Sequence, residues 1–223
     1  SEPCLLSALE LSNLLSKGDI TADELAKSYL KRIEKFEKDV KAWAFFDSNF
    51  VLKKASECDN LKNIGRPIGP LHGIPIAIKD IFGTDEMPTE CGTILRKKRY
   101  SKGDSTVVSL LKSSGAYVMG KTVTTEFAYF DPGKTTNPHD YNRTPGGSSS
   151  GSAAAVASFM TPVAIGSQTN GSVIRPASYC GVLGYKPSYG LISRNGVLRQ
   201  SFLLDHVGIF SRTVDDLAFI SQE

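Results

Sequence analysis

Residues 74–79 read Ile-Pro-Ile-Ala-Ile-Lys, a near-continuous apolar run bounded by Gly73 and Asp80. A strand with one solvent-exposed face alternates apolar and polar residues, whereas a short unbroken apolar run is typical of a strand buried on both faces. Such a strand needs other elements packed on each side of its sheet. The segment therefore predicts an α/β fold and places Lys79 at the end of a buried strand.

The rest of the chain alternates between helix and strand patterns. Periodic or well-capped stretches predict helices at 7–17, 21–38, 49–61, 105–113 and 152–160 and after Thr213. Short apolar runs predict further strands at 42–46, 116–119, 162–165 and 182–185. Residues 131–147, rich in Pro, Gly, Asn and Thr, predict a long loop. This alternation predicts an α/β sheet covered by helices on both faces.

Capping residues mark several of the helix ends. Thr21 and Glu24 are spaced as a capping box, in which each side chain accepts a hydrogen bond from the other residue's backbone. Ser105 and Thr213 are the expected caps of two later helices, and Gly18 stops the first helix. These capping residues therefore define the helix ends more closely than the hydrophobic periodicity alone does.

The composition excludes several classes of protein. The chain has 223 residues, of which 40% are hydrophobic and 22% charged, which is ordinary for a globular domain and argues against disorder. The net charge of +3 is too weak to attract nucleic acid or a membrane through a global field. The basic cluster at 96–99 is read as a solvated loop rather than an anion-binding patch, and no apolar run is long enough to span a membrane. We expect neither nucleic acid nor a membrane as a partner.

The four cysteines do not form a metal-binding or disulfide pattern. They are widely spaced, with no C-x-x-C pair and no Cys/His cluster at zinc spacing, at positions 4, 58, 91 and 180. We interpret them as reduced thiols in a reducing compartment. The N-terminal residues lead into an amphipathic helix and do not resemble a signal peptide. The expected location is the cytoplasm, and no metal site is expected.

Two segments rich in glycine and serine stand out. Residues 146–152 read GGSSSGS and lead at once into the apolar run AAAVA, which is unlike a flexible linker between domains. Residues 166–177 read GSQTNGSVIRPA and follow the predicted strand at 162–165. Small residues let the backbone turn sharply and direct successive N–H groups one way, as an oxyanion hole requires. Taken alone, the second segment is equally consistent with an ordinary strand-to-helix turn capped by Ser172.

Together with Lys79, these segments form a recognisable pattern. The chain resembles the amidase signature family over nearly its whole length, in GPLHGIPIAIKD (69–80), SSGAYVMGKTVTTEFA (113–128), TPGGSSSGSAAAVA (144–157) and GSQTNGSVIRPASYCGVLGYKPS (166–188). The family usually has Asp-Thr-Gly-Gly-Ser where this chain has Gln-Thr-Asn-Gly-Ser, and GGSSGGS where it has GGSSSGS. The resemblance implies a mixed, largely buried sheet in a single domain over residues 1–223, cut short on its C-terminal side.

The resemblance also implies a Ser–cis-Ser–Lys triad, with Ser172 as nucleophile, Ser148 as the bridging serine after a cis peptide bond, and Lys79 as base. A serine hydroxyl needs a base to take its proton. Burial disfavours an ammonium ion, so a lysine at the end of a buried strand has a lowered pKa and can accept a proton. The three histidines lie in loop-like contexts and are assigned structural roles: His72, His139 and His206.

The remaining site residues follow from the second segment. The backbone N–H groups of Thr169, Asn170 and Gly171 are candidates for the oxyanion hole, and Ser167 is expected to hydrogen-bond Ser148. Arg175, three residues after the nucleophile, is spaced as in malonamidase-type members, where this arginine holds a substrate carboxylate. The alternative is that it pairs with an internal acid such as Asp205. The expected reaction is hydrolysis of a small-molecule amide through an acyl-enzyme, without a cofactor.

Three other functions stay open on sequence grounds. Residues 115–122, GAYVMGKT, fit the nucleotide-binding pattern G-x-x-x-x-G-K-[ST], although their interior is strand-like and they follow a helical segment. A catalytically inactive scaffold is disfavoured because all three triad residues are present. The amidase component of a tRNA-dependent amidotransferase, which uses glutamine beside a partner subunit, shares the fold and triad. Homodimer formation is left open.

Overall fold

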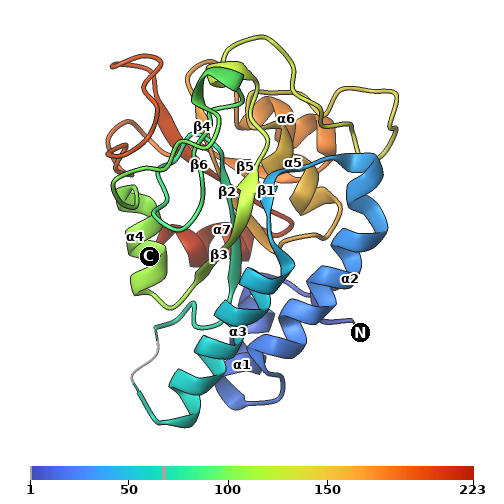
Figure 1. Cartoon of the computed structure of the whole chain (residues 1–223), viewed down its shortest axis with the longest axis vertical. Coiled ribbons are helices and arrows are strands. Elements are labelled where there is room, and N and C mark those ends of the chain that lie inside the picture. Colours follow the sequence, from blue (N-terminus) through green and yellow to red (C-terminus); the bar gives the residue numbers. More distant parts are fainter. Residues whose placement is uncertain (1, 67–68) are drawn as a thin grey trace.

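Two parallel strands, β2 (Pro75–Lys79) and β4 (Val163–Gln168), lie side by side in the middle of a six-stranded sheet (Figure 1). The computed structural model describes residues 2–66 and 69–223. The strand order is β1-β3-β2-β4-β6-β5, with the other strands at Trp43–Phe46 (β1), Tyr117–Thr122 (β3), Leu183–Tyr185 (β5) and His206–Ser211 (β6). Strands β3, β2 and β4 are parallel, and the outer pairings are antiparallel. The predicted mixed sheet is confirmed.

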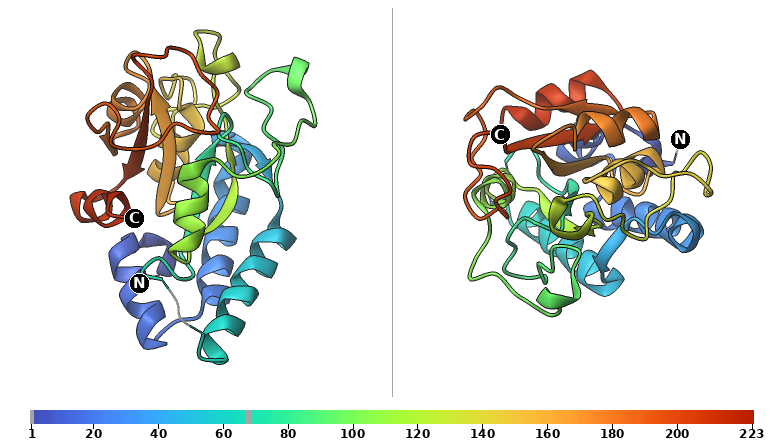
Figure 2. Two further views of the ribbon diagram at one scale, coloured as in Figure 1. Left: turned by 90° about the vertical axis from the view of Figure 1, so that its left-hand side faces the viewer. Right: turned by 90° about the horizontal axis from the view of Figure 1, so that it is seen from above.

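The helices flank this sheet (Figures 1 and 2). They are α1 (Ala8–Lys17), α2 (Ala22–Val40), α3 (Ser48–Asn63), α4 (Thr106–Ser113), α5 (Ser150–Ala157), α6 (Ile174–Cys180) and α7 (Val214–Ser221). Short 3-10 turns occur at Pro3–Leu5, Ile94–Arg96 and Glu126–Ala128. Helix α5 contacts strands β1, β2, β3, β4 and β6, while α3 and α4 contact β3 and α7 contacts β6. Every residue of β2 is buried, as the apolar run predicts.

The predicted helix caps are confirmed, with one exception. The Thr21 hydroxyl accepts from the Glu24 N–H and the Glu24 carboxylate accepts from the Thr21 N–H, and the Thr213 side chain caps α7. Gly18 ends α1 with a left-handed φ of 84°. Ser105 stands at the N-cap of α4 but its hydroxyl makes no cap hydrogen bond. Its backbone is packed against Gly196, where an added Cβ would lie 2.6 Å from the Ser105 Cα.

Strand β6 is absent from the sequence prediction, and His206 begins this strand rather than lying in a loop. Gly208 interrupts the apolar pattern in the middle of the strand and hides it from pattern analysis. The glycine is needed because an added Cβ would lie 2.6 Å from Cγ2 of Val173. The packing of the segment after β4 onto β6 therefore explains why the strand is weakly marked in the sequence.

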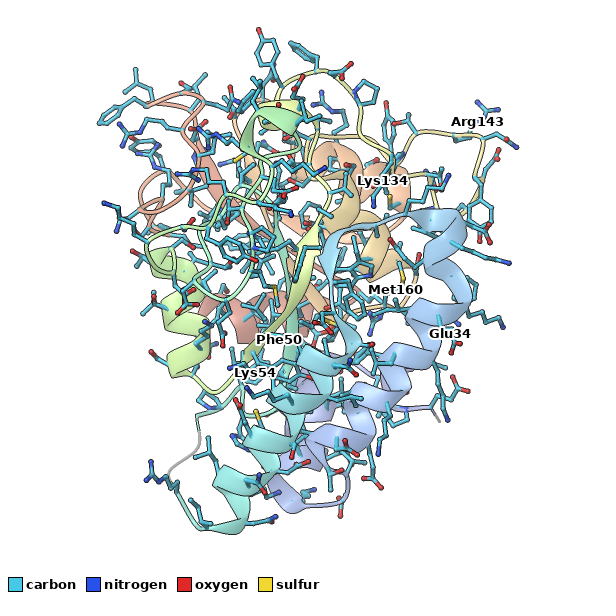
Figure 3. All side chains as sticks on the ribbon, viewed as in Figure 1. Glu34, Phe50, Lys54, Lys134, Arg143 and Met160 are labelled. Atoms are coloured by element: carbon cyan, nitrogen blue, oxygen red, sulfur yellow. The ribbon has the colours of Figure 1, made fainter. Side chains whose placement is uncertain are left out.

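Helix α5 begins two residues before the predicted 152–160 helix and ends three residues earlier. A serine in its first turn is bonded to the sheet. The Ser152 hydroxyl lies 2.7 Å from that of Thr122 and donates to the Ile165 carbonyl at 3.1 Å. The predicted loop at 131–147 is confirmed, and it exposes Arg143 at the edge of the molecule (Figure 3). Within the described ranges, no helix is long and apolar enough to cross a membrane.

Candidate active site

Lys79 and two serines form a buried polar cluster at the carboxyl ends of β2 and β4. The Lys79 side chain is fully buried, and its Nζ donates to Ser148 Oγ at 2.7 Å and to Ser167 Oγ at 2.9 Å. The parallel register pairs Ile78 with Ile165, so the ends of the two strands meet at one edge of the sheet and bring Lys79 beside Ser167. Ser148 reaches the same point from the loop that precedes α5.

The surroundings of Lys79 favour a neutral amine. Burial lowers the pKa of Lys79 to about 7, and the nearby Asp205 carboxylate and Cys91 sulfur oppose this shift only in part. Among the described residues, no carboxylate lies within salt-bridge distance of its Nζ. A substantial fraction of Lys79 is therefore unprotonated at neutral pH and able to accept a proton from a bound hydroxyl.

Lys121, the second buried lysine, has a different environment. Its Nζ lies 3.3 Å from the Asp80 carboxylate and donates to the Phe82 carbonyl at 3.0 Å, the Pro88 carbonyl at 3.0 Å and the Thr89 hydroxyl at 2.8 Å. The ammonium is thus held by a full set of acceptors, and it ties β3 to the segment that follows β2. Lys121 is the lysine of GAYVMGKT, and residues 117–122 form a buried strand. The nucleotide-binding interpretation is therefore wrong, since a phosphate-binding loop must leave its backbone and lysine free.

The loop that carries Ser148 is fixed by close backbone packing. The peptide bond between Gly147 and Ser148 is cis, as the family resemblance implies. Gly146 has a left-handed φ of 77°, and an added Cβ there would lie 2.9 Å from the Cα of Pro176. The Ser149 hydroxyl donates to the Ser167 carbonyl at 3.1 Å and accepts from its N–H at 3.3 Å. The loop is therefore held against both α6 and β4.

The turn between β4 and α6 carries Ser172. Gly171 adopts a left-handed φ of 83°, and the Gln168 side chain accepts from the Val173 N–H at 2.9 Å and the Ile174 N–H at 3.1 Å. Gln168 thus caps α6 from the position where the family usually has aspartate. Ser172 is buried, and its hydroxyl makes no hydrogen bond to any described residue.

The backbone of this turn leaves several donors unused. Across residues 2–66 and 69–223, the N–H groups of Thr169, Asn170, Gly171 and Ser172 have no hydrogen-bond acceptor. Four successive free donors beside a serine form the kind of nest that stabilises a developing negative charge. The turn therefore has the donors that an oxyanion hole needs.

One predicted contact of the site is wrong, and one contact that the sequence left open is not made. The sequence predicts a hydrogen bond between Ser167 and Ser148, but the Ser167 hydroxyl accepts from Lys79 instead. Arg175 does not pair with Asp205. Its Nε donates to the Gly147 carbonyl at 3.1 Å and its Nη2 to the Asn170 carbonyl at 3.4 Å, so the guanidinium reaches back over the turn and links the two serine loops. Among the described residues it has no carboxylate partner.

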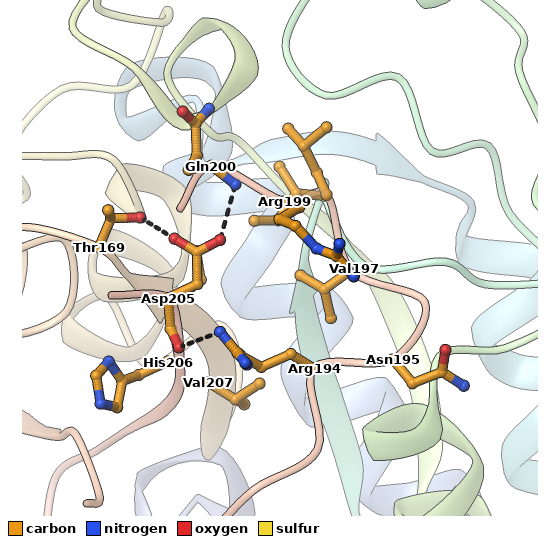
Figure 4. Close-up of a pocket in the computed structure, with 12 residues that line it drawn as sticks. Thr169, Arg194, Asn195, Val197, Arg199, Gln200, Asp205, His206 and Val207 are labelled. Carbon is orange, nitrogen blue, oxygen red and sulfur yellow. Dashed lines mark hydrogen bonds between the residues drawn. The ribbon is translucent and has the colours of Figure 1, made fainter. Parts of the chain in front are cut away.

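A cavity of about 230 Å³ opens beside this cluster (Figure 4). It is lined by Ile81, Ser167, Thr169, Arg194, Asn195, Val197, Leu198, Arg199, Gln200, Asp205, His206 and Val207. Apart from Ser167 and Thr169, the polar lining comes from the segment at 194–206, which sequence reasoning did not assign to the site. That segment shows no helical or strand periodicity, so only its proximity to the turn after β4 identifies it. In the part of the chain that the structure describes, no cluster of His, Cys, Asp and Glu suits a metal ion.

Comparison with known proteins identifies the family of the chain. Residues 24–223 match the family model described as Amidase. The chain belongs to the amidase family. It is 40% identical over 220 residues to a glutamyl-tRNA(Gln) amidotransferase subunit of Acidothermus cellulolyticus, covering 96% of this chain and 44% of that protein. It is 42% identical over 221 residues to the corresponding subunit of Symbiobacterium thermophilum, covering 96% and 45%.

Solved amidase structures have the same fold as this family member. A peptide amidase from Stenotrophomonas maltophilia superimposes with a TM-score of 0.90 at 34% sequence identity, covering 96% of this chain and 47% of that one. A fatty acid amide hydrolase superimposes with a TM-score of 0.91 at 28% identity, covering 98% and 40%. This amidase-family chain therefore spans slightly less than half the length of the relatives that it matches.

Proposed function

We propose that this chain carries the catalytic centre of an amide-bond hydrolase in which Ser172 is the nucleophile, Ser148 the bridging residue and Lys79 the base. The observation that carries the proposal is the hydrogen bond from buried Lys79 to Ser148 at 2.7 Å, made without a carboxylate partner on the ammonium among the described residues. Burial and the lowered pKa of Lys79 support its role as base.

In the proposed reaction, Ser172 Oγ attacks the amide carbonyl carbon while its proton passes to Ser148, whose own proton passes to Lys79. The carbonyl oxygen becomes an oxyanion that the free N–H groups of the turn stabilise. The relay then returns a proton to the leaving nitrogen, the C–N bond breaks, and ammonia or an amine departs. Water, activated by the same relay, hydrolyses the acyl-enzyme and regenerates the Ser172 hydroxyl.

For the substrate, we propose a small amide that bears a carboxylate. Arg175 is exposed at the start of α6 and has no acidic partner among the described residues, so its guanidinium has capacity for an anion. A guanidinium binds a carboxylate through two parallel hydrogen bonds. The contacts of Arg175 with the Gly147 and Asn170 carbonyls support a competing role as a brace, and the two roles make different kinetic predictions.

A second candidate is the amidase component of a tRNA-dependent amidotransferase that takes ammonia from glutamine. It is favoured by the names of the relatives that are 40% and 42% identical to this chain. The two candidates are separated by comparing ammonia release from glutamine and from malonamate by the full-length protein. Efficient turnover of glutamine, rising when partner subunits are added, would favour the amidotransferase role.

The test of the shared chemistry is the Ser172→Ala variant of the full-length protein. We expect ammonia release to fall by at least about 10³-fold, since the nucleophile is lost, with thermal stability little changed. Ser178→Ala is the matched control, because Ser178 is an exposed serine of α6 whose side chain makes no hydrogen bond to a described residue. Near wild-type turnover by the Ser172 variant would rule out the proposed nucleophile.

A further inference from the structure

Asp205 is an acid that the sequence pattern did not assign to the reaction, and it lies directly opposite the turn that carries Ser172. Strands β4 and β6 are antiparallel, and their ladder ends with Gln168 paired to His206. The next residue of each chain segment is Thr169 on one side and Asp205 on the other. The strand register therefore holds Asp205 at the first residue of the turn (Figure 4).

The carboxylate of Asp205 accepts three hydrogen bonds. Its Oδ1 accepts from the Thr169 hydroxyl at 2.5 Å, and its Oδ2 accepts from the N–H groups of Gln200 at 2.7 Å and Ser201 at 2.9 Å. Two of these donors, Thr169 and Gln200, belong to different segments that both line the cavity. One carboxylate therefore joins the proposed oxyanion turn to the loop that forms the cavity wall.

The turn is held at two successive residues. Asp205 holds the Thr169 side chain, and Arg175 donates to the Asn170 carbonyl at 3.4 Å. The backbone N–H groups of these two residues stay free of acceptors among the described residues. Fixing a turn through its side chain and its carbonyl, while leaving its N–H groups free, preorganises those donors for an oxyanion.

Asp205 also lies near Lys79, since it lines the same cavity as Ser167, whose hydroxyl accepts from Lys79 Nζ at 2.9 Å. Its negative charge favours the ammonium form of Lys79, as does Cys91 from the segment after β2. The other acid near this lysine in sequence, Asp80, is neutralised by its ion pair with Lys121. Asp205 itself is half-buried and has no salt bridge within the described residues, and the nearby Arg194 binds its main-chain carbonyl at 3.2 Å rather than its carboxylate.

We propose that Asp205 is a positioning residue of the amidase centre: it fixes the turn that presents the oxyanion donors, and its carboxylate stabilises Lys79 as an ammonium while the proton relay runs. This inference rests on the proposed function. The Asp205 side chain thus has two effects. Its hydrogen bond to Thr169 fixes the turn, and its negative charge acts on Lys79.

Two variants of the full-length protein separate these effects. Thr169→Val removes the hydroxyl and keeps the charge, whereas Asp205→Asn removes the charge while its amide oxygen can still accept from the Gln200 and Ser201 N–H groups and its NH2 can donate to the Thr169 hydroxyl. We expect each to lower kcat/KM for amide hydrolysis at least about tenfold. Only Asp205→Asn is expected to move the acidic limb of the pH profile, toward lower pH by roughly 0.5 unit or more, because losing the anion lowers the pKa of Lys79 further.

A substrate-independent measurement checks the same shift. The rate at which a fluorophosphonate probe labels Ser172 depends on the proton relay, so its pH dependence should shift in Asp205→Asn and stay in place in Thr169→Val. Asp205→Ser, which also removes the charge, replaces Asp205→Asn if that variant does not fold. An unshifted pH dependence in a folded, uncharged variant, or undiminished turnover, would overturn the proposal. Failure of the proposed function would look different: Ser172→Ala would then be active and the probe would not label Ser172.

Discussion

At the scale of the residue, Lys79 and Lys121 show how partners decide the role of a buried lysine. Both side chains are completely buried on neighbouring strands. Lys121 is surrounded by a carboxylate and carbonyl oxygens, which suit an ammonium ion. Lys79 contacts two hydroxyl groups, which suit a neutral amine equally well because each hydroxyl can donate or accept.

The pKa of Lys79 leads to a prediction about the pH dependence of activity. Since the base must be neutral, and burial lowers its pKa to about 7, kcat/KM should fall as the pH drops through 7 and reach a plateau above it. Lys79→Met should abolish this acidic limb and lower kcat/KM by roughly 10²–10⁴-fold. Steady-state kinetics between about pH 5 and pH 9 measure both. A limb centred near the ordinary lysine pKa would contradict the assignment of Lys79 as the base.

Arg175 supports a second prediction at this scale. If it binds a substrate carboxylate, Arg175→Lys should lower kcat/KM for malonamate at least about tenfold, about 1.4 kcal/mol, and spare propionamide, because lysine cannot make the bidentate contact. If it only braces the Gly147 and Asn170 carbonyls, both substrates should lose equally. The ratio of the two losses decides between the roles.

At the scale of the element, the position of α5 determines where Ser148 lies. Helix α5 approaches the sheet so closely that a Cβ on Gly151 would lie 2.3 Å from the Ala42 carbonyl oxygen and 2.4 Å from the Val123 nitrogen. Both are backbone atoms of the β1 and β3 region and cannot move aside easily. Glycine in the first turn of this helix is therefore a packing requirement.

We predict that Gly151→Ala lowers the free energy of unfolding by roughly 1–3 kcal/mol, since overpacking forces the helix away from the sheet. It should also lower kcat, because Ser148 moves with the start of α5. Gly103→Ala is the matched control, as an added Cβ there meets no atom within 4 Å. Urea denaturation and amide turnover on the same samples provide the measurements. Equal stability of the two variants would show that the helix adjusts freely.

At the scale of the whole molecule, Lys121 links β3 to the chain that leaves β2. Removing one partner of a buried ion pair leaves the other charge uncompensated. Lys121→Met should therefore lower the free energy of unfolding by about 3–5 kcal/mol, measured by urea denaturation. Lys27→Met is the control, because its exposed pair with Asp23 contributes at most about 1 kcal/mol. A Lys121 variant as stable as the control would show that the buried Asp80 carboxylate does not need the Lys121 ammonium to compensate its charge.

Much of the fold is predictable because its signals are local. The buried strand at 74–79, the capping box of Thr21 and Glu24, and the two glycine- and serine-rich loops depend on residues within a few positions of one another. Lys79 is identifiable from its place at the end of an apolar run, and the burial that this implies is confirmed. The sequence by itself thus determined most of the helices and strands, β6 excepted, and the family to which the chain belongs.

Only the tertiary structure decided which side chains meet. Strand β6 is masked in the sequence by Gly208, whose small size is required by the packing of Val173. Asp205 reaches Thr169 because the register of β6 against β4 joins positions that are 36 residues apart. Lys79 contacts Ser167 because two parallel strands end at one edge of the sheet. Such contacts depend on strand order and register, which are set by packing across the whole sheet and leave no mark in any single stretch of sequence.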